Sequence, residues 1–262
     1  ELDVCSSDLQ SLIHKNARFY ILKNENPDGK KECITGIISI FKGETVMHCL
    51  PDTAMPDEIK CQIAYELAKY PLFCINGEMH GTDFLISLLK KYNGKTIQTK
   101  NTYNLMTKCK SRNPIEKKPM LSIKQCKKND VTNLLPLELS YQEEEVLPAG
   151  HHADPKVYNY TLSKQMETQF IFCASDSSGM PVAKAATNAL FWNWAQLGGV
   201  YTVPEQRRNG FAYALVEHVS EFLLKQNRYC ALFVNIKNTA ANNLYKKCGF
   251  LPLTSYCIAY YS

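Results

Sequence analysis

The chain has 262 residues and a net charge of +5, with 45% hydrophobic and 21% charged residues. This composition is ordinary for a globular protein, and it excludes the disordered, collagen-like and coiled-coil classes. The charge is spread over both halves of the sequence, so we expect no nucleic-acid partner. No apolar stretch approaches the roughly 20 residues that span a bilayer, and the sequence does not open with a basic and apolar leader. We therefore expect a cytoplasmic protein without a membrane partner.

Eleven cysteines are scattered along the sequence. No two of them have Cys-x-x-Cys spacing, and no pair of histidines accompanies them at the spacing of zinc ligands. Most of them fall inside apolar runs, where a thiol behaves as a small hydrophobic side chain. We therefore expect reduced cysteines and no metal site, rather than a disulfide scaffold.

The first half of the sequence alternates strand-like and helix-like segments. Residues 1–9 have no clear period, and we leave them out of the fold prediction. Runs of β-branched and aromatic residues predict strands, and apolar residues at helical spacing predict helices. We expect strands at residues 18–22, 34–41, 45–50 and 72–75, and helices at residues 57–70 and from 82 or 83 to 92. These elements form a small α/β domain over residues 1–110, in which we find no phosphate loop and no acid–base pair.

The second half carries more regular patterns. Between Lys108 and Pro119 the sequence is basic, with two prolines and few apolar residues, which predicts a linker over residues 111–119. Within residues 120–262 we expect helices at 128–141, 211–226 and 239–248, and strands at 168–175, 181–194, 197–203, 229–235 and 251–261. Strands and helices in this order predict an α/β (α+β) fold with a mixed sheet covered by helices.

The segment that carries chemistry runs from Gly199 to Ala212, where a predicted strand enters a short loop that opens directly into a helix. Backbone N–H groups converge in such a loop, and the helix N-terminus adds its partial positive charge. Gly210 lets a ligand approach the backbone, and Arg207 and Arg208 add charge at the rim. The loop is therefore of the kind that holds a pyrophosphate, although it is neither a P-loop nor a dinucleotide fingerprint. A structural turn with two solvated arginines is the alternative.

Two separated signatures favour the pyrophosphate loop. The run Gln206–Ala212 fits the pattern Arg/Gln-x-x-Gly-x-Ala and resembles the acetyl-CoA pyrophosphate loop of the GNAT family of N-acetyltransferases. The run Asn235–Phe250 resembles the second signature of that family. The resemblance covers about residues 120–262, and it extends to a bacterial subgroup with an extra N-terminal domain. It implies a GNAT-like, mixed and mostly antiparallel sheet flanked by helices.

The resemblance also implies where the donor binds and where the reaction occurs. Pantetheine amides would pair with the exposed backbone edge of the strand, and the loop would hold the pyrophosphate. The implied acetyl-CoA-binding residues are Val200, Tyr201, Thr202, Val203, Arg207, Arg208, Asn209, Gly210, Phe211, Ala212, Asn235 and Asn238. Tyr245 matches the tyrosine that typically protonates the departing thiolate; without the resemblance we would expect it to pack beside Leu244 and Phe250. Acetyl-CoA is the expected acyl donor, and the reaction requires no metal.

The general base is the part of the site that the sequence leaves open. The expected strand Leu197–Val203 carries no carboxylate, so the nearest candidates are Glu143–Glu145, and we place the base at Glu145. A solvated acidic helix end is the alternative explanation for this run. His151 and His152 titrate near neutral pH and could relay a proton, although a surface loop would also account for them.

The expected function is that of an acetyl-CoA-dependent N-acetyltransferase, in which an amine attacks the thioester carbonyl directly. The expected partner is a small-molecule or peptide amine, and the acidic run would suit a cationic one. Lys184 and Asn188, at strand spacing, could line the same cleft. The alternative function is a non-catalytic regulatory module that binds acyl-CoA. The N-terminal domain is either a degenerate copy of the same fold, which would cap the acceptor site or mediate formation of a homodimer, or a module for a separate partner.

Overall fold

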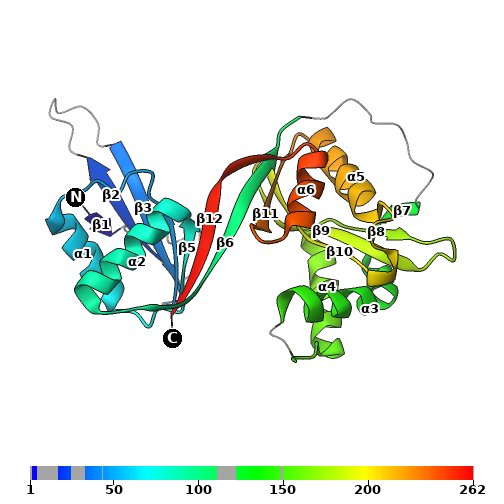
Figure 1. Ribbon diagram of the computed structural model, residues 1–262, viewed down its shortest axis with the longest axis horizontal. Helices are drawn as coiled ribbons and strands as arrows, with labels where there is room; N and C mark the ends of the chain where they lie inside the picture. Colours follow the sequence, from blue (N-terminus) through cyan, green and yellow to red (C-terminus); the bar gives the residue numbers. More distant parts are fainter. Residues whose placement is uncertain are drawn as a thin grey trace. The chain divides into compact units, whose positions relative to one another are not determined.

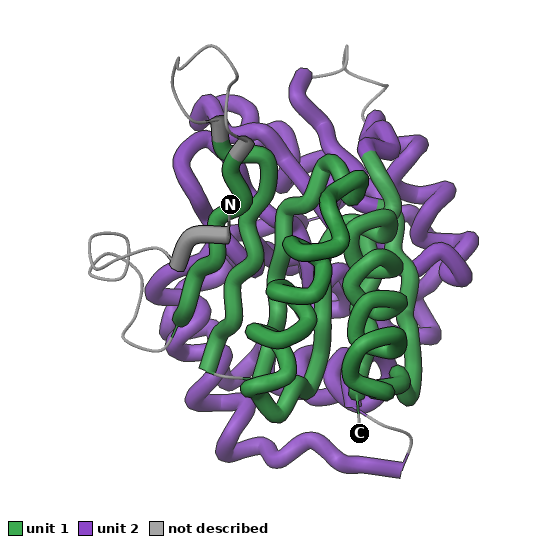
Figure 2. Tube along the Cα trace, turned by 90° about the vertical axis from the view of Figure 1, so that its left-hand side faces the viewer, with its two compact units in different colours: residues 1–104, 254–262 green, residues 105–253 purple. Residues whose placement is uncertain are grey.

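The computed structural model describes residues 2–4, 17–24, 33–42, 44–110, 122–147 and 150–261. The chain divides into two compact units, which are coloured separately in Figure 2. Unit 1 comprises Glu1–Asn104 with Thr254–Ser262, and unit 2 comprises Leu105–Leu253. This division differs from the expected one, because the C-terminal residues pack with the first unit. The expected linker at residues 111–119 lies outside the described residues.

Unit 1 is a sheet with two helices on one face (Figure 2). Its strand order is β1–β2–β3–β4–β5–β12, with β6 next to β12. Strands β2, β3 and β4 are antiparallel, and β4 and β5 are parallel across helix α1. The elements are β1 (Leu2–Val4), β2 (Ala17–Asn24), β3 (Cys33–Phe41), β4 (Thr45–Cys49), α1 (Asp57–Ala68), β5 (Cys74–Glu78), α2 (Met79–Asn93), the first part of β6 (Ile97–Lys108) and the last part of β12 (Leu251–Tyr261).

Unit 2 is a mixed, mostly antiparallel sheet between two pairs of helices (Figure 1). Its strand order is β6–β11–β10–β9–β8–β7, in which β10 and β11 are parallel across α5. Helix α5 packs on one face, where α6 also lies, and α3 and α4 pack on the other. The elements are β7 (Ser122–Gln125), α3 (Val131–Tyr141), α4 (Pro155–Thr168), β8 (Ile171–Ser175), β9 (Pro181–Phe191), β10 (Trp194–Thr202), α5 (Phe211–Lys225), β11 (Tyr229–Asn235) and α6 (Thr239–Lys247).

The two units repeat one order of elements. In unit 1, three antiparallel strands lead through a helix to a parallel strand and then through a second helix to another strand, as β2–β3–β4–α1–β5–α2–β6. In unit 2 the same order appears as β8–β9–β10–α5–β11–α6–β12. This repetition is the order that a degenerate copy of the same fold, one of the two alternatives for the first domain, would have.

Several elements differ from the sequence-based prediction. Strands β1, β6 and β7 and helix α4 were not expected, and the expected strand over residues 181–194 ends earlier, in a hairpin. Trp192 occupies the hairpin turn with φ of 47°, and Arg228 Nη1 donates to its carbonyl at 2.7 Å. Helix α2 begins at Met79 rather than at residue 82 or 83. Lys108, which we assigned to the basic stretch, is buried at the end of β6 and donates to Glu217 Oε1 at 3.1 Å.

Helix α4 begins at a start signal that is present in the sequence. Asp154 is its N-cap residue and accepts a hydrogen bond from the Lys156 backbone N–H at 2.8 Å, and Pro155 occupies the first helical position. Leu162 is the one fully buried residue of the helix, and Tyr158 and Met166 are half-buried four residues before and after it, so its apolar stripe is short. No helix in the described ranges is long and apolar enough to cross a membrane.

Candidate functional site

Strands β10 and β11 separate where the candidate site begins. Their parallel pairing ends at Leu197 with Leu232, and within the described chain it does not continue further. Strand β10 also changes register with β9 between Gly198 and Tyr201, and Gly199 has φ of 57°, a conformation that favours glycine. An irregularity of this kind redirects a strand. The second half of β10 therefore presents a backbone edge that β11 does not pair.

The loop after β10 ends at a helix N-terminus without a side-chain cap. Gly210 is the N-cap residue of α5, with φ of 87°, and no side chain accepts a hydrogen bond from the first turn of the helix. A Cβ atom on Gly210 would meet no atom within 4 Å. Arg208 also has a positive φ, of 64°. Open N–H groups and the positive end of the α5 dipole therefore meet at this point, which is the arrangement that binds phosphate groups.

Arg207 is held by an acidic side chain rather than directed at the rim of the loop. Its Nη2 lies 2.6 Å from both carboxylate oxygens of Glu144, and its Nε donates to the Thr202 carbonyl at 3.0 Å. The Tyr201 hydroxyl also donates to Glu144, at 2.9 Å. Burial alone would raise the pKa of Glu144, but the bonds from Arg207 and Tyr201 outweigh it and lower the pKa. Glu144 therefore remains ionised and links the loop to the segment after α3.

Not every residue expected on the open edge of β10 has free backbone groups. The Val203 N–H donates to the Val182 carbonyl, and the Val203 carbonyl accepts from the Gln206 N–H, both at 3.0 Å. The Thr202 carbonyl accepts from Arg207. The edge that remains open for a ligand is therefore shorter than the expected stretch and is centred on Val200.

The three glutamates after α3 have three different environments. They lie in a π-helical turn, η2 (Gln142–Val146). Glu143 accepts from the Ala153 backbone N–H at 3.0 Å, and Glu144 pairs with Arg207. Glu145 is exposed, and its charge contributes to a raised pKa of Tyr245, of which burial is the main cause. Glu145 is therefore the member of the run that acts electrostatically on the expected catalytic tyrosine.

Tyr245 lies on α6 with a buried ring. The ring packs edge-on against Phe250, with centroids 6.0 Å apart, so the packing alternative is also realised. Burial first, and then the nearby Cys248, Tyr141 and Glu145, raise its pKa. The phenol is therefore protonated at neutral pH and can donate a proton.

The side-chain oxygens of the two expected asparagines of the second signature accept hydrogen bonds from nearby backbone N–H groups. Asn238 is the N-cap residue of α6, and its Oδ1 accepts from the Ala241 N–H at 3.0 Å. Asn235 Oδ1 accepts from the Lys237 N–H at 2.9 Å. Within the described residues, the side-chain NH₂ groups of both asparagines have no partner, so each can still donate to a ligand.

A buried ion pair under β10 was not recognised from the sequence. Lys184 and Glu138 are 3% and 5% exposed, and Lys184 Nζ lies 2.7 Å from Glu138 Oε2. Lys184 Nζ is also 3.9 Å from the Tyr141 ring centroid, and it would be 3.2 Å from a Cβ on Gly199. The pair therefore lies directly beneath the irregularity of β10. The available signal was the position of Glu138 four residues after Leu134, on the apolar face of α3.

The corresponding loop of unit 1 has a different character. Residues 50–56, between β4 and α1, contain no glycine, and α1 begins after Pro56 with Asp57 and Glu58 in its first turn. Two carboxylates at a helix N-terminus repel a phosphate. Unit 1 therefore does not repeat the anion site of unit 2.

No cluster of three or more His, Cys, Asp or Glu side chains in the described part of the chain is arranged to hold a metal ion. His151 and His152, for which the sequence left open a proton relay or a surface loop, are exposed in the segment before α4. His152 Nδ1 lies 3.4 Å from Glu143 Oε1.

Residues 134–250 match the model of the family described as the acetyltransferase (GNAT) family. Three similar solved structures cover most of the chain. An acetyltransferase of the GNAT family from Colwellia psychrerythraea is 12% identical, with a TM-score of 0.62 and 100% of both chains covered. A GCN5-related N-acetyltransferase from Sphaerobacter thermophilus is 14% identical, with a TM-score of 0.61, covering 94% of this chain and 80% of the other. A Drosophila protein is 14% identical, with a TM-score of 0.61 and coverage of 93% and 79%. At these identities the likeness shows the fold alone. Comparison with curated proteins gives no match.

Proposed function

Residues 134–250 form a domain of the GNAT acetyltransferase family, and on that premise we propose that the protein transfers an acetyl group from acetyl-CoA to a primary amine. The observation that carries the proposal is the open edge of β10 next to the uncapped N-terminus of α5. Backbone groups around Val200 suit the amides of the pantetheine arm, and the N–H groups at the start of α5 suit the pyrophosphate. The side-chain NH₂ groups of Asn235 and Asn238 supply further donors.

The chemistry follows from the groups around this edge. The nitrogen of the amine attacks the carbonyl carbon of the thioester; a C–N bond forms and the C–S bond breaks. The nitrogen loses a proton to Glu145, and Tyr245 gives a proton to the sulfur, so the products are an amide and the CoA thiol. Transfer of the proton from Glu145 to Tyr245 through solvent restores both groups. The raised pKa of Tyr245 keeps it protonated until the thiolate, a stronger base in this buried site than in water, departs.

Calorimetric titration with acetyl-CoA tests the donor site. In Gly210→Glu, a carboxylate occupies the place of the pyrophosphate, and we expect acetyl-CoA affinity to fall by at least tenfold. Gly179→Glu is the matched control, because Gly179 has φ of 86° and a Cβ there also meets no atom within 4 Å, but it lies in a turn before β9. Equal affinities of wild type and Gly210→Glu, or no binding by the folded wild type, would contradict the proposal.

Replacement of the tyrosine separates an enzyme from a module that only binds acyl-CoA. We expect Tyr245→Phe to lower turnover by about 10²-fold or more and to leave acetyl-CoA affinity unchanged, because the ring and its packing on Phe250 remain. The measurement is release of CoA thiol with a panel of amines, amino acids and peptides. Tyr229→Phe, at a half-exposed strand start, is the control. A wild type that binds acetyl-CoA and transfers it to none of these acceptors would favour the regulatory module.

A further inference from the structure

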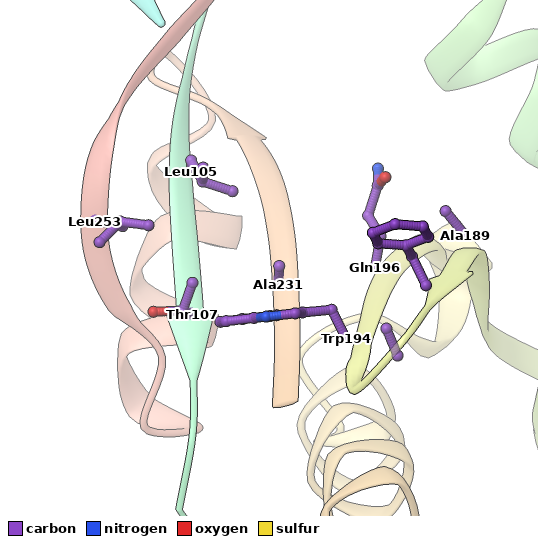
Figure 3. Close-up of a pocket in the computed structure, with 9 residues that line it drawn as sticks. Leu105, Thr107, Ala189, Trp194, Gln196, Ala231 and Leu253 are labelled. Carbon is purple, nitrogen blue, oxygen red and sulfur yellow. The ribbon is translucent and has the colours of Figure 1, made fainter. Parts of the chain in front are cut away.

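An apolar groove of about 340 Å³ lies on the sheet of unit 2 (Figure 3). Its walls come from five neighbouring strands, with Leu105 of β6, Ala189 of β9, Ala231 of β11 and Leu253 of β12 among the lining residues. Gln196 and a threonine are the polar members of the lining, and no charged side chain belongs to it. The volume is within the range of small-molecule sites, and the lining suits an uncharged, apolar group.

The groove adjoins the open edge of β10. Gln196 pairs with Ala189 on one side and with Ala231 on the other, so these three residues form one row across the groove. The pairing of β10 with β9 shifts register between Gln196 and Leu197 and again between Gly198 and Tyr201, and Gly198 follows Gln196 by two residues. Residues two apart point to the same face of a strand and lie about 7 Å apart. A group held at the irregularity is therefore a short alkyl chain away from the groove.

Around the irregularity of β10, the groove is the space that remains for an acyl chain. In the plane of the sheet, the pairing of Leu197 with Leu232 closes the gap between β10 and β11. On the face covered by α5, Ala195 and Leu197 are buried in the core together with Phe211. On the opposite face, Ala189 is exposed, and Gln196 and Ala231 are half-buried.

Trp194 forms the end of the groove. Figure 3 shows its indole extending across β11, beside Ala231 and toward Thr107. The indole packs edge-on against Tyr229, with centroids 5.2 Å apart. The groove therefore has an aromatic wall at this end, which limits the length of the group that it takes. Toward the irregularity of β10, the exposed side chain of Asn188 lies against Gly198.

We propose that this groove binds the acyl chain of the donor, and that the protein accepts acyl-CoA thioesters with apolar chains longer than acetyl, such as butyryl and hexanoyl. This inference rests on the proposed function, because the thioester must lie at the open edge of β10. The apolar chain would displace water from the groove without leaving a charged side chain unsolvated. Chains that extend past Trp194 would not fit.

The test is calorimetric titration of the full chain with CoA, acetyl-CoA, butyryl-CoA, hexanoyl-CoA and dodecanoyl-CoA. A fully buried methylene corresponds to about 0.8 kcal/mol, or about fourfold in affinity. We expect hexanoyl-CoA to bind at least tenfold more tightly than acetyl-CoA, because the groove is partly open. We expect no further gain for dodecanoyl-CoA, because of the wall at Trp194.

Two variants connect this preference to the groove. Ala189→Phe fills the groove from an exposed position, and we expect the affinity ratio of hexanoyl-CoA to acetyl-CoA to fall to within about twofold of one, with acetyl-CoA affinity unchanged. Trp194→Ala removes the end wall, and we expect dodecanoyl-CoA to gain at least threefold over hexanoyl-CoA. Trp192→Ala is the matched control, because this neighbouring tryptophan is 83% exposed and does not line the groove.

The outcomes distinguish this inference from the proposed function. Equal affinities for acetyl-CoA and hexanoyl-CoA would overturn the acyl-chain assignment and leave the donor site intact. So would a chain-length preference that Ala189→Phe does not change. If phenethylamine bound to the CoA-saturated wild type but not to Ala189→Phe, the groove would belong to the acceptor instead. If the wild type self-associated and Ala189→Phe did not, the groove would bind a second copy of the chain. Absence of binding by CoA and all its thioesters would overturn both proposals.

Discussion

Arg207 and Glu144 form an ion pair in which Nη2 lies 2.6 Å from each carboxylate oxygen. The pair joins the loop before α5 to the turn after α3, across 63 residues of sequence. The first arginine of the proposed pyrophosphate loop is therefore already neutralised by a carboxylate. Attraction of an anion to this loop depends on the backbone N–H groups, the α5 dipole and the exposed Arg208.

Replacement of Glu144 by glutamine tests whether Glu144 competes with the phosphate groups of the donor for Arg207. Glu144→Gln removes a negative charge beside the loop and releases Arg207, so we expect acetyl-CoA to bind about two- to fivefold more tightly at low salt. The gain should shrink at 0.5 M salt, because the pair is partly exposed. Calorimetry at both salt concentrations gives the answer. Weaker binding by Glu144→Gln would mean instead that Glu144 holds Arg207 in the position that binds the donor.

The buried pair of Lys184 with Glu138 predicts an asymmetric effect on stability. Glu138→Gln leaves a buried ammonium group without its counter-charge, and we expect the free energy of unfolding to fall by about 3–5 kcal/mol. Burial already lowers the pKa of Lys184, and loss of Glu138 would lower it further, so the deficit should shrink as pH rises. The double variant Glu138→Leu/Lys184→Met should unfold within about 2 kcal/mol of the wild type. Urea unfolding measures all three proteins; a double variant as unstable as the single one would contradict this account.

A histidine in unit 1 predicts a stability that depends on pH. His48 packs over Gly77 and Gly81, where a Cβ would lie 2.3 Å and 2.7 Å from the imidazole, and its Nε2 is 2.7 Å from Thr82 Oγ1. Burial lowers the pKa of His48 to about 4, although the charge of Glu78 opposes the shift. The unfolded chain therefore binds a proton below about pH 6.5 that the folded protein excludes until about pH 4.

The free energy of unfolding should therefore be highest above pH 6.5 and should fall as pH drops toward 4. His48 contributes on the order of 2 kcal/mol to this loss of unfolding free energy, and the partial exposure of the imidazole limits its contribution. Urea unfolding of the wild type and of His48→Gln at pH 7.0 and pH 4.5 isolates it from the carboxylates that titrate in both proteins. The variant should lose less stability between the two pH values. An equal loss in both would show that His48 is protonated in the folded state.

Local signals in the sequence predicted the elements around the candidate site. Gly210 directly before a helix, the buried strand that follows this helix and the helical spacing after Asn238 are all signals that act within a few residues. Strand β6 was missed, because most of its residues are polar and only Met106 and Lys108 are fully buried. Its pairing depends on β11 and β12, which come more than 120 residues later in the chain.

The sequence by itself determined the loop and helix that suit a pyrophosphate, because a glycine with positive φ followed by an amphipathic helix is a local arrangement. It could also place Tyr245 on its helix. Only the tertiary structure decided which charged side chains form ion pairs within the protein. Glu144 meets Arg207, and Glu138 meets Lys184, through contacts between segments 46 or more residues apart. Such contacts depend on how sheet and helices pack, and the same packing formed the groove beside β10, which no single segment of the sequence encodes.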